Sequence, residues 1–156
     1  RRTRMPRQEA QEFIDTYFKR FPGVRAYLDD TKQQAAEQGY VSTIFGRRRY
    51  VADITSSNFN RRTAAERIAI NMPLQGTAAD IMKLAMIRMQ RELREHGYQA
   101  RMLLQVHDEL LFETPESEVP QLAMLVKDVM ENIATLNVPL VTEVSTGHNW
   151  DELAPM

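Results

Sequence analysis

The sequence predicts an α+β fold in which helices back an antiparallel sheet. Two observations carry this prediction. From residue 76 onward, the apolar pattern has in turn the spacing of a helix, a hairpin, a second helix and a strand. In addition, 43% of the 156 residues are apolar and 26% are charged, which is typical of a globular chain with a hydrophobic core. The length suits one ordinary domain and is short for two.

The first forty residues have the pattern of two helices. Aromatic and aliphatic residues at three- and four-residue spacing predict an amphipathic helix over residues 8–21. Pro22 suits the first turn of a second helix that runs to about Gln38, and Gly39 suits the position just past its end.

A short hairpin and a further helix follow. Residues 40–51 form two β-rich runs around Gly46, the pattern of a hairpin. We expect residues 53–60 to form a polar loop and residues 61–72 to form a helix. Because proline has no backbone N–H, we expect Pro73 to interrupt that helix.

The second half contains the predicted sheet. Over residues 76–95, apolar residues surround most of a helix, which predicts a largely buried helix. Residues 102–113 consist of two apolar runs on either side of three polar residues, the pattern of a hairpin with a polar turn. A helix over about 115–135 and a final strand over 138–144 complete the prediction.

The polar turn, His107-Asp108-Glu109, is the first candidate for chemistry. Turns that contain Asp usually have Gly, Asn, Pro or Ser beside it, and this one has none. The strands would hold the Asp108 carboxylate at the edge of the sheet, and carboxylate oxygens are ligands that Mg²⁺ prefers. The alternative is a solvated charged turn. A single Asp also leaves a two-metal site incomplete, because such sites take carboxylates from more than one element.

A polar stripe is the second candidate. Arg67, Asn71 and Gln75 are spaced four residues apart, which places them on one face of a helix, and we expect Pro73 to bend this face between the last two. All three can donate to the acceptors that every base pair presents in the minor groove. This chemistry suits DNA binding without sequence preference, and the alternative is an exposed face of a surface helix. The arginine clusters 47–49 and 61–62 either contact phosphates or form solvated basic turns.

Composition and charge exclude some kinds of site. The 156 residues contain no cysteine, so they form no disulfide, no thiolate metal site and no cysteine nucleophile. No apolar run reaches the ~18–20 residues of a membrane span. Residues 1–74 hold 14 Lys/Arg and 8 Asp/Glu, whereas residues 75–156 hold 6 and 13. A basic half beside an acidic half weakly indicates a surface that binds a polyanion next to a site that binds a cation. The alternative is an ordinary solvated surface.

Several short motifs, taken in order, resemble those of one enzyme family. Residues 105–110, Gln-Val-His-Asp-Glu-Leu, resemble the C motif on the palm hairpin of family A DNA polymerases, the bacterial DNA polymerase I type. Residues 65–67 and 71–80 are similar to that family's helix leading into the palm. Residues 39–41 and 45–50 are similar to the fingers segment before it. The order and spacing of these motifs argue strongly against chance similarity.

The resemblance implies a fold and a division into subdomains. Residues 1–60 would be the remainder of a fingers subdomain, made of helices and an arginine-rich hairpin. Residues 61–156 would be a palm portion, with an antiparallel palm-type sheet, a catalytic hairpin and helices behind the sheet. The family's other palm motif, with the partner Asp, and the fingers helix that binds the incoming nucleotide have no counterpart in these residues.

The resemblance also implies roles for individual residues. Asp108 would be one of two carboxylates that bind the catalytic pair of Mg²⁺ ions, with Glu109 as a supporting, less essential carboxylate. His107 would lie near the primer's 3′ terminal nucleotide. Arg67 and Gln75 would contact the primer–template minor groove. Asn71, on the same helix face, would hold the template or neighbouring side chains.

The implied function is that of a DNA-directed DNA polymerase, a nucleotidyltransferase of DNA replication and repair. Its partners would be primer–template DNA, deoxynucleoside triphosphates and an upstream fingers, thumb and palm segment, in the bacterial cytoplasm at the nucleoid rather than at a membrane. With half of a catalytic site, the chain alone should not polymerise. Two alternatives remain: a non-catalytic nucleic-acid-binding module of polymerase-like shape, and a metal-dependent phosphohydrolase that uses Asp108 and Glu109. Asp108→Ala would separate the polymerase from the binding module.

Overall fold

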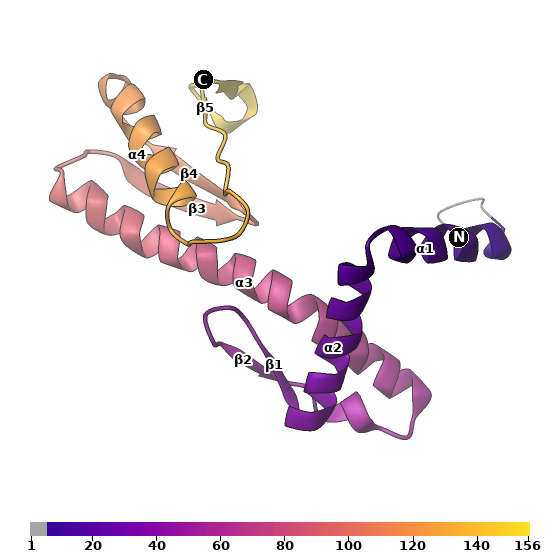
Figure 1. Ribbon diagram of the computed structural model, residues 1–156. Coiled ribbons are helices and arrows are strands. Elements are labelled where there is room, and N and C mark those ends of the chain that lie inside the picture. The colour runs from indigo at the N-terminus through magenta and orange to yellow at the C-terminus, as the bar shows by residue number, and fades with distance from the viewer. Residues whose placement is uncertain (1–5) are drawn as a thin grey trace. The chain divides into compact units, whose positions relative to one another are not determined.

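The computed structural model describes residues 6–156 (Figure 1). The chain forms two compact units that divide between Gly76 and Thr77. One long helix, α3 (Phe59–Glu95), contributes its first part to the first unit and its second part to the second. Each unit buries its own small cluster of apolar side chains.

The first unit contains the predicted two helices and hairpin. Its elements are α1 (Arg7–Arg20), α2 (Pro22–Gln38), β1 (Tyr40–Ser42), β2 (Arg48–Tyr50), the 3-10 turn η1 (Ala52–Thr55) and the first part of α3. Pro22 occupies the first turn of α2, and Gly39 ends that helix with a left-handed φ of 77°. β1 and β2 pair antiparallel around Gly46, whose φ is 83°. The predicted turn chemistry is confirmed.

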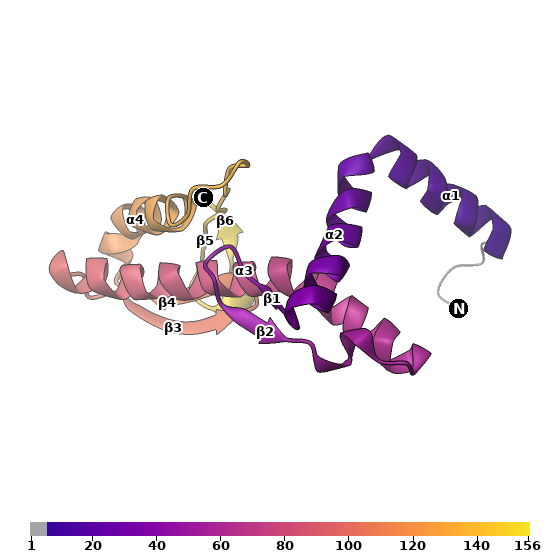
Figure 2. The same ribbon diagram turned by 60° about the horizontal axis from the view of Figure 1, so that its bottom comes forward.

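The core of the first unit joins α2, the hairpin and α3. It consists of Ala35, Val41, Val51, Ile54, Ala65, Ala69 and Met72. Helix α1 lies at the other end of α2 from the hairpin (Figures 1 and 2) and contains no buried residue. The predicted helix is therefore present, but its apolar face is exposed; Phe13, for example, is 66% exposed.

Helix α3 begins two residues earlier than predicted and continues through Pro73. Asn58 caps its first turn, because the Asn58 Oδ1 accepts hydrogen bonds from the N–H groups two and three residues later, at 3.0 and 3.2 Å. The predicted interruption at Pro73 is wrong. A proline removes one hydrogen bond from the ladder, but buried side chains on both sides of it, such as Ala69 and Met82, hold the neighbouring turns in the helix.

The second unit packs helices against an antiparallel hairpin, which confirms the α+β class. Its elements are the second part of α3, β3 (Arg101–Val106), β4 (Glu109–Glu113), η2 (Glu116–Glu118), α4 (Val119–Glu131), β5 (Ser145–Thr146), η3 (Trp150–Glu152) and β6 (Ala154–Pro155). Its core consists of Met89, Leu93, Ala100, Leu122, Val126 and Val129, with Phe112 packed against them. These residues come mainly from α3 and α4, with Phe112 from the β3–β4 hairpin, and Figures 1 and 2 show these three elements next to one another.

The second part of α3 is buried along one stripe rather than on all sides. Met82, Ala85, Met89 and Leu93 are buried, whereas Ile87 is 69% exposed. The prediction of a largely buried helix is wrong, because α4 and the hairpin cover only one side of α3 within this unit. Neither α3 nor any other helix of residues 6–156 is both long and apolar enough to cross a membrane.

The C-terminal segment differs most from the prediction. Helix α4 ends at Glu131, a few residues short of its predicted end, and the predicted strand over 138–144 does not form. A strand needs a partner for its backbone groups, and none of the sheets in the described residues includes this segment; only at its end, next to β5, does the Val144 carbonyl oxygen accept a hydrogen bond from the N–H of Met156, at 3.0 Å. The N–H of Thr142 instead donates to the Glu131 carboxylate at 2.9 Å, and Val141 remains 77% exposed.

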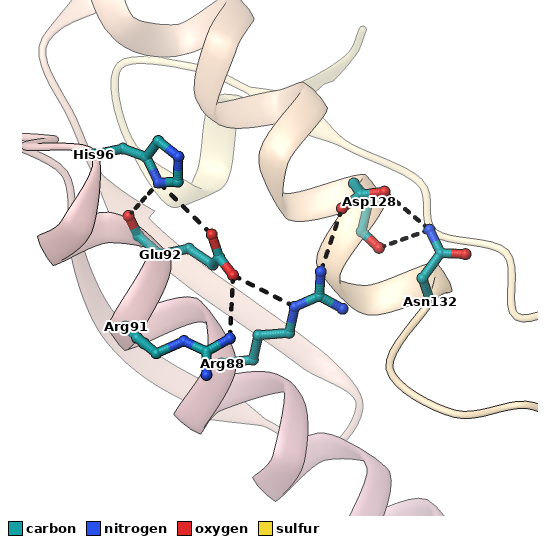
Figure 3. A network of polar contacts seen from close by, with 6 residues as sticks. All are labelled: Arg88, Arg91, Glu92, His96, Asp128 and Asn132. Carbon is teal, nitrogen blue, oxygen red and sulfur yellow. Dashed lines mark hydrogen bonds and ion pairs between the residues drawn. The ribbon is translucent and has the colours of Figure 1, made fainter.

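A polar network joins α3 to α4 on the surface of the second unit (Figure 3). The Arg88 guanidinium lies 3.6 Å from the Glu92 carboxylate and 3.6 Å from the Asp128 carboxylate. Asn132 donates to Asp128 Oδ1 at 3.0 Å, and His96 Nδ1 lies 3.0 Å from the Glu92 carbonyl oxygen. Arg88 therefore links the two helices that cover the hairpin.

Candidate nucleic-acid and metal-binding sites

The predicted polar stripe lies in a groove of the first unit. The groove has a volume of about 300 Å³. Arg67, Asn71 and Gln75 all line it from α3, as their spacing predicts. Two arginines of the β1–β2 hairpin, Arg47 and Arg49, line the groove with them, and Ile68, Met72 and Gly76 complete the lining.

The alternation of side chains along β2 places Arg48 and Arg49 on opposite faces of the hairpin. Arg49 pairs with Val41, so these two side chains share a face of the hairpin, and Val41 is buried in the core with α3. Arg48 is on the opposite face, where its guanidinium lies 4.5 Å from the centre of the Tyr40 ring. Arg49 therefore faces α3 and the groove, and Arg48 faces away from them.

Arg47 holds the hairpin against α3. Its Nη2 donates to the carbonyl oxygen of Gly76 at 2.9 Å, and its own N–H donates to the hydroxyl of Thr43 at 3.2 Å. Gly76 is buried at this contact, and a Cβ there would lie only 2.7 Å from Thr43 Cγ2. The hairpin can approach the helix this closely because residue 76 has no side chain.

The groove is strongly basic. Three guanidinium groups line it, and no carboxylate does. Within the described residues, neither Arg49 nor Arg67 forms an ion pair with an acidic side chain. The amides of Asn71 and Gln75 are exposed beside these charges. The arrangement offers hydrogen-bond donors and positive charge to one extended anionic ligand.

The second arginine cluster, predicted as a phosphate contact or a solvated turn, has a structural role at one of its two positions. Arg62 Nη1 donates to the carbonyl oxygen of Ser56 at 3.0 Å, and its guanidinium lies 5.8 Å from the centre of the Phe59 ring. Arg62 therefore secures the start of α3, while the neighbouring Arg61 side chain is exposed.

The polar turn lies in the second unit, where β3 and β4 meet. Val106 pairs with Glu109, so His107 and Asp108 are the two residues of the turn and Glu109 already belongs to β4. His107 has a left-handed φ of 54°, a conformation in which His is enriched among residues other than glycine. Gln105 supports the turn by donating to the carbonyl oxygen of His107.

The turn fits one side of a magnesium site. The side chains of Asp108 and Glu109 are exposed, and carboxylate oxygens are the hard ligands that Mg²⁺ takes together with waters and phosphates. No group of three His, Cys, Asp or Glu side chains that could hold a metal ion occurs within residues 6–156. The chemistry of the two carboxylates of the turn fits such an ion.

The structure brings the sequence candidates together in two groups. Arg67, Asn71 and Gln75 share the groove of the first unit, and the polar turn lies in the second. That Arg47 and Arg49 join the stripe on α3 is not evident from the sequence. Period-two alternation could have separated Arg48 from Arg49, but no local signal shows that the hairpin packs on that part of the helix.

Known proteins are similar in sequence to this chain. Residues 1–152 match the profile described as DNA polymerase family A. The chain is 56% identical to DNA polymerase I of Pseudomonas aeruginosa over 146 residues, which cover 94% of this chain and 16% of that protein. It is 54% identical to DNA polymerase I of Geobacillus stearothermophilus over 144 residues, or 92% and 16% of the two chains. The chain thus spans about one sixth of the length of these relatives.

A solved structure is also similar. It is the POL domain of Pol1 from M. smegmatis in complex with DNA primer-template and dNTP. The match has a TM-score of 0.85 and 50% sequence identity, and it covers 87% of this chain and 24% of the other.

Proposed function

The chain belongs to DNA polymerase family A, and we propose that it works as part of a DNA-directed DNA polymerase that adds deoxynucleotides to a primer 3′ end. One observation carries this proposal: a chain with this family's sequence gathers Arg67, Asn71 and Gln75 in one basic groove. The similar M. smegmatis domain is described in complex with primer-template and dNTP, which supports a DNA duplex and nucleotides as partners.

The groove of the first unit contacts the minor groove of the primer–template. Arg67 and Gln75 donate to the N3 and O2 acceptors that all correct base pairs present there. Asn71, one turn from each of them, holds the template or the neighbouring side chains. A mispair displaces these acceptors and leaves a donor unpaired, which costs roughly 1–3 kcal/mol. The groove therefore favours correctly paired primer ends.

The polar turn supplies one side of the catalytic centre. Asp108 is the main metal-binding carboxylate, and Glu109 supports it at the start of β4. His107 lies beside the primer's 3′ terminal nucleotide. When bound, a pair of Mg²⁺ ions would activate the 3′-hydroxyl and neutralise charge on the triphosphate. The tight turn places the backbone of Asp108 at the end of the two strands.

We further propose that these residues work within a longer polymerase. Residues 1–60 are the remainder of its fingers and residues 61–156 are part of its palm. An upstream segment supplies the partner carboxylate, because the described residues hold no third metal-binding group near the turn. Such an enzyme serves DNA replication and repair in the bacterial cytoplasm at the nucleoid.

A chimaera tests the proposal. In this chimaera, residues 1–152 of this chain replace the matching segment of the Pseudomonas aeruginosa enzyme, to which the chain is 56% identical. We call this chimaera the reconstituted polymerase. We expect the reconstituted polymerase to extend a primer with Mg²⁺ and four deoxynucleotides, and the purified 156-residue chain to give no extension. Extension by the chain alone would contradict the division of the catalytic site. A chimaera that is folded and binds duplex DNA but fails to extend would favour a non-catalytic binding module.

A further inference from the structure

We propose that the β1–β2 hairpin forms a phosphate-binding wall of the groove, in which Arg49 contacts a backbone phosphate of the duplex whose minor groove meets α3. This inference rests on the proposed function, because it takes the groove as the DNA-binding surface. It adds a ligand class and a residue to that surface: a phosphodiester, bound by the hairpin.

The orientation of Arg49 is the first argument. Its strand partner Val41 is buried against α3, so the same face of the hairpin carries Arg49 to the groove. Arg48, one residue earlier, stacks on Tyr40 on the opposite face, where Tyr40 and Tyr50 also pair with ring centres 5.9 Å apart. The two neighbouring arginines therefore have the same charge and different surroundings.

The charge of the groove is the second argument. Arg49 and Arg67 are exposed and form no ion pair with a described acidic residue, and the lining contains no carboxylate. Guanidinium groups without a carboxylate partner attract phosphate, which they bind through two parallel hydrogen bonds. Arg47 is engaged differently, since its Nη2 donates to the Gly76 carbonyl oxygen and thereby fixes the hairpin.

The geometry of DNA is the third argument. The minor groove of B-DNA is only about 6 Å wide and is bordered by phosphates on both sides. If Arg67 and Gln75 on α3 reach base edges, then a wall beside them meets a phosphate rather than a base. The hairpin is that wall. Of its two arginines at the groove, Arg47 donates to the Gly76 carbonyl oxygen, and Arg49 is the one that we assign to the phosphate. It would supply affinity that depends on salt and not on base sequence.

The test measures the affinity of the reconstituted polymerase for a primer–template duplex between 50 and 200 mM salt. Affinity falls as salt rises, and we expect Arg49→Ala to make this fall less steep, by about 0.9 in the slope of log affinity against log salt, because one phosphate contact is lost. The ratio of the parent's affinity to the affinity of the Arg49→Ala variant would therefore be about 3.5-fold smaller at 200 mM than at 50 mM salt. Arg49→Lys should keep the slope. Arg48→Ala removes the same charge from the opposite face and should leave the slope unchanged.

A duplex with a single methylphosphonate locates the contact. Scanning this neutral linkage along both strands should reveal one position at which the parent loses affinity and Arg49→Ala does not. An Arg49→Ala slope equal to that of Arg48→Ala would overturn the proposal. The proposal would also be overturned if Arg49→Ala left the salt slope unchanged but altered the preference for matched over mismatched primer ends, because Arg49 would then contact bases.

These results are separable from those that test the proposed function. A reconstituted polymerase that binds duplex DNA but extends no primer would contradict the function, while the Arg49 slope would still decide the phosphate contact. A polymerase that extends normally with Arg49→Ala and keeps its full salt slope would overturn the phosphate contact alone.

Discussion

The guanidinium of Arg47 donates a hydrogen bond of 2.9 Å to the main-chain carbonyl of Gly76. The two residues are 29 positions apart in the sequence, and this bond fixes the β1–β2 hairpin on α3 next to Gln75. Because the hairpin and the helix each form one side of the groove, the contact sets the distance between the arginines of β2 and the polar stripe of α3.

The close approach at Gly76 gives the first prediction. In an open helix, Gly→Ala stabilises by about 1 kcal/mol. Here the new Cβ would lie 2.7 Å from Thr43 Cγ2, and Thr43 is buried and accepts a hydrogen bond from the N–H of Arg47. We therefore expect Gly76→Ala to destabilise the reconstituted polymerase by about 1–3 kcal/mol, measured as the shift of its thermal inactivation.

Thr43→Ser is the matched control for this prediction. It removes the Cγ2 methyl and keeps the hydroxyl that Arg47 uses. In this background, Gly76→Ala should cost clearly less, because the remaining close neighbours of the new Cβ, Met72 Cε at 3.2 Å and Arg47 Nη2 at 3.3 Å, are the ends of flexible side chains. Equal destabilisation in both backgrounds would show that the clash is not with Thr43.

The polar stripe gives the second prediction. Gln75→Ala removes a minor-groove donor, so extension of a matched primer end should slow by about 5- to 150-fold, which corresponds to 1–3 kcal/mol. Extension of a mismatched end should change little, since that donor is already unpaired there. Single-turnover rates on both ends measure the difference. Gln90→Ala, at an exposed position elsewhere on α3, is the control, and an equal loss on both ends would contradict the role of Gln75.

The cap of α3 gives the third prediction. The Asn58 Oδ1 accepts two hydrogen bonds from the first turn of the helix. We expect Asn58→Ala to cost about 1 kcal/mol and Asn58→Asp to cost much less, because aspartate caps equally well. Hydrogen exchange at the first turn of α3 measures this. Equal exchange rates in the two variants would mean that the side-chain oxygen does not stabilise the helix.

Many elements of the fold could be predicted because their signals are local. Pro22, Gly39 and Gly46 mark the ends of their elements through backbone preferences that act within a few residues. The strand expected over 138–144 is wrong for the opposite reason. Its β-branched residues favour an extended backbone, but a strand also needs a partner, which local preference cannot supply.

The same distinction applies to the candidate site. The stripe of Arg67, Asn71 and Gln75 and the polar turn at Asp108 follow from periodicity alone, and the structure places them as expected. The arrival of Arg49 at the groove depends on a tertiary contact between the hairpin and α3, so no pattern in either segment predicts it.

The second unit gives the fourth prediction. The Arg88–Asp128 pair in Figure 3 lies at the surface, with side chains 33% and 62% exposed. Asp128→Asn should cost less than about 1 kcal/mol, and high salt should abolish the cost. Met89 is fully buried in the core under these helices, so Met89→Ala should cost about 2–5 kcal/mol at any salt concentration. Denaturation at low and high salt measures both, and a salt-independent effect of Asp128→Asn would contradict this assignment.

The central claim is that Asp108 provides a metal-binding carboxylate for nucleotide addition. Its most direct test is single-nucleotide incorporation by the reconstituted polymerase with Asp108→Ala, with Glu143→Ala as a control that removes an exposed carboxylate elsewhere in the second unit. We predict that Asp108→Ala slows incorporation at least about 10²–10³-fold with little change in duplex affinity, and that Glu143→Ala does neither. Incorporation by the Asp108→Ala variant at the control rate would contradict the claim.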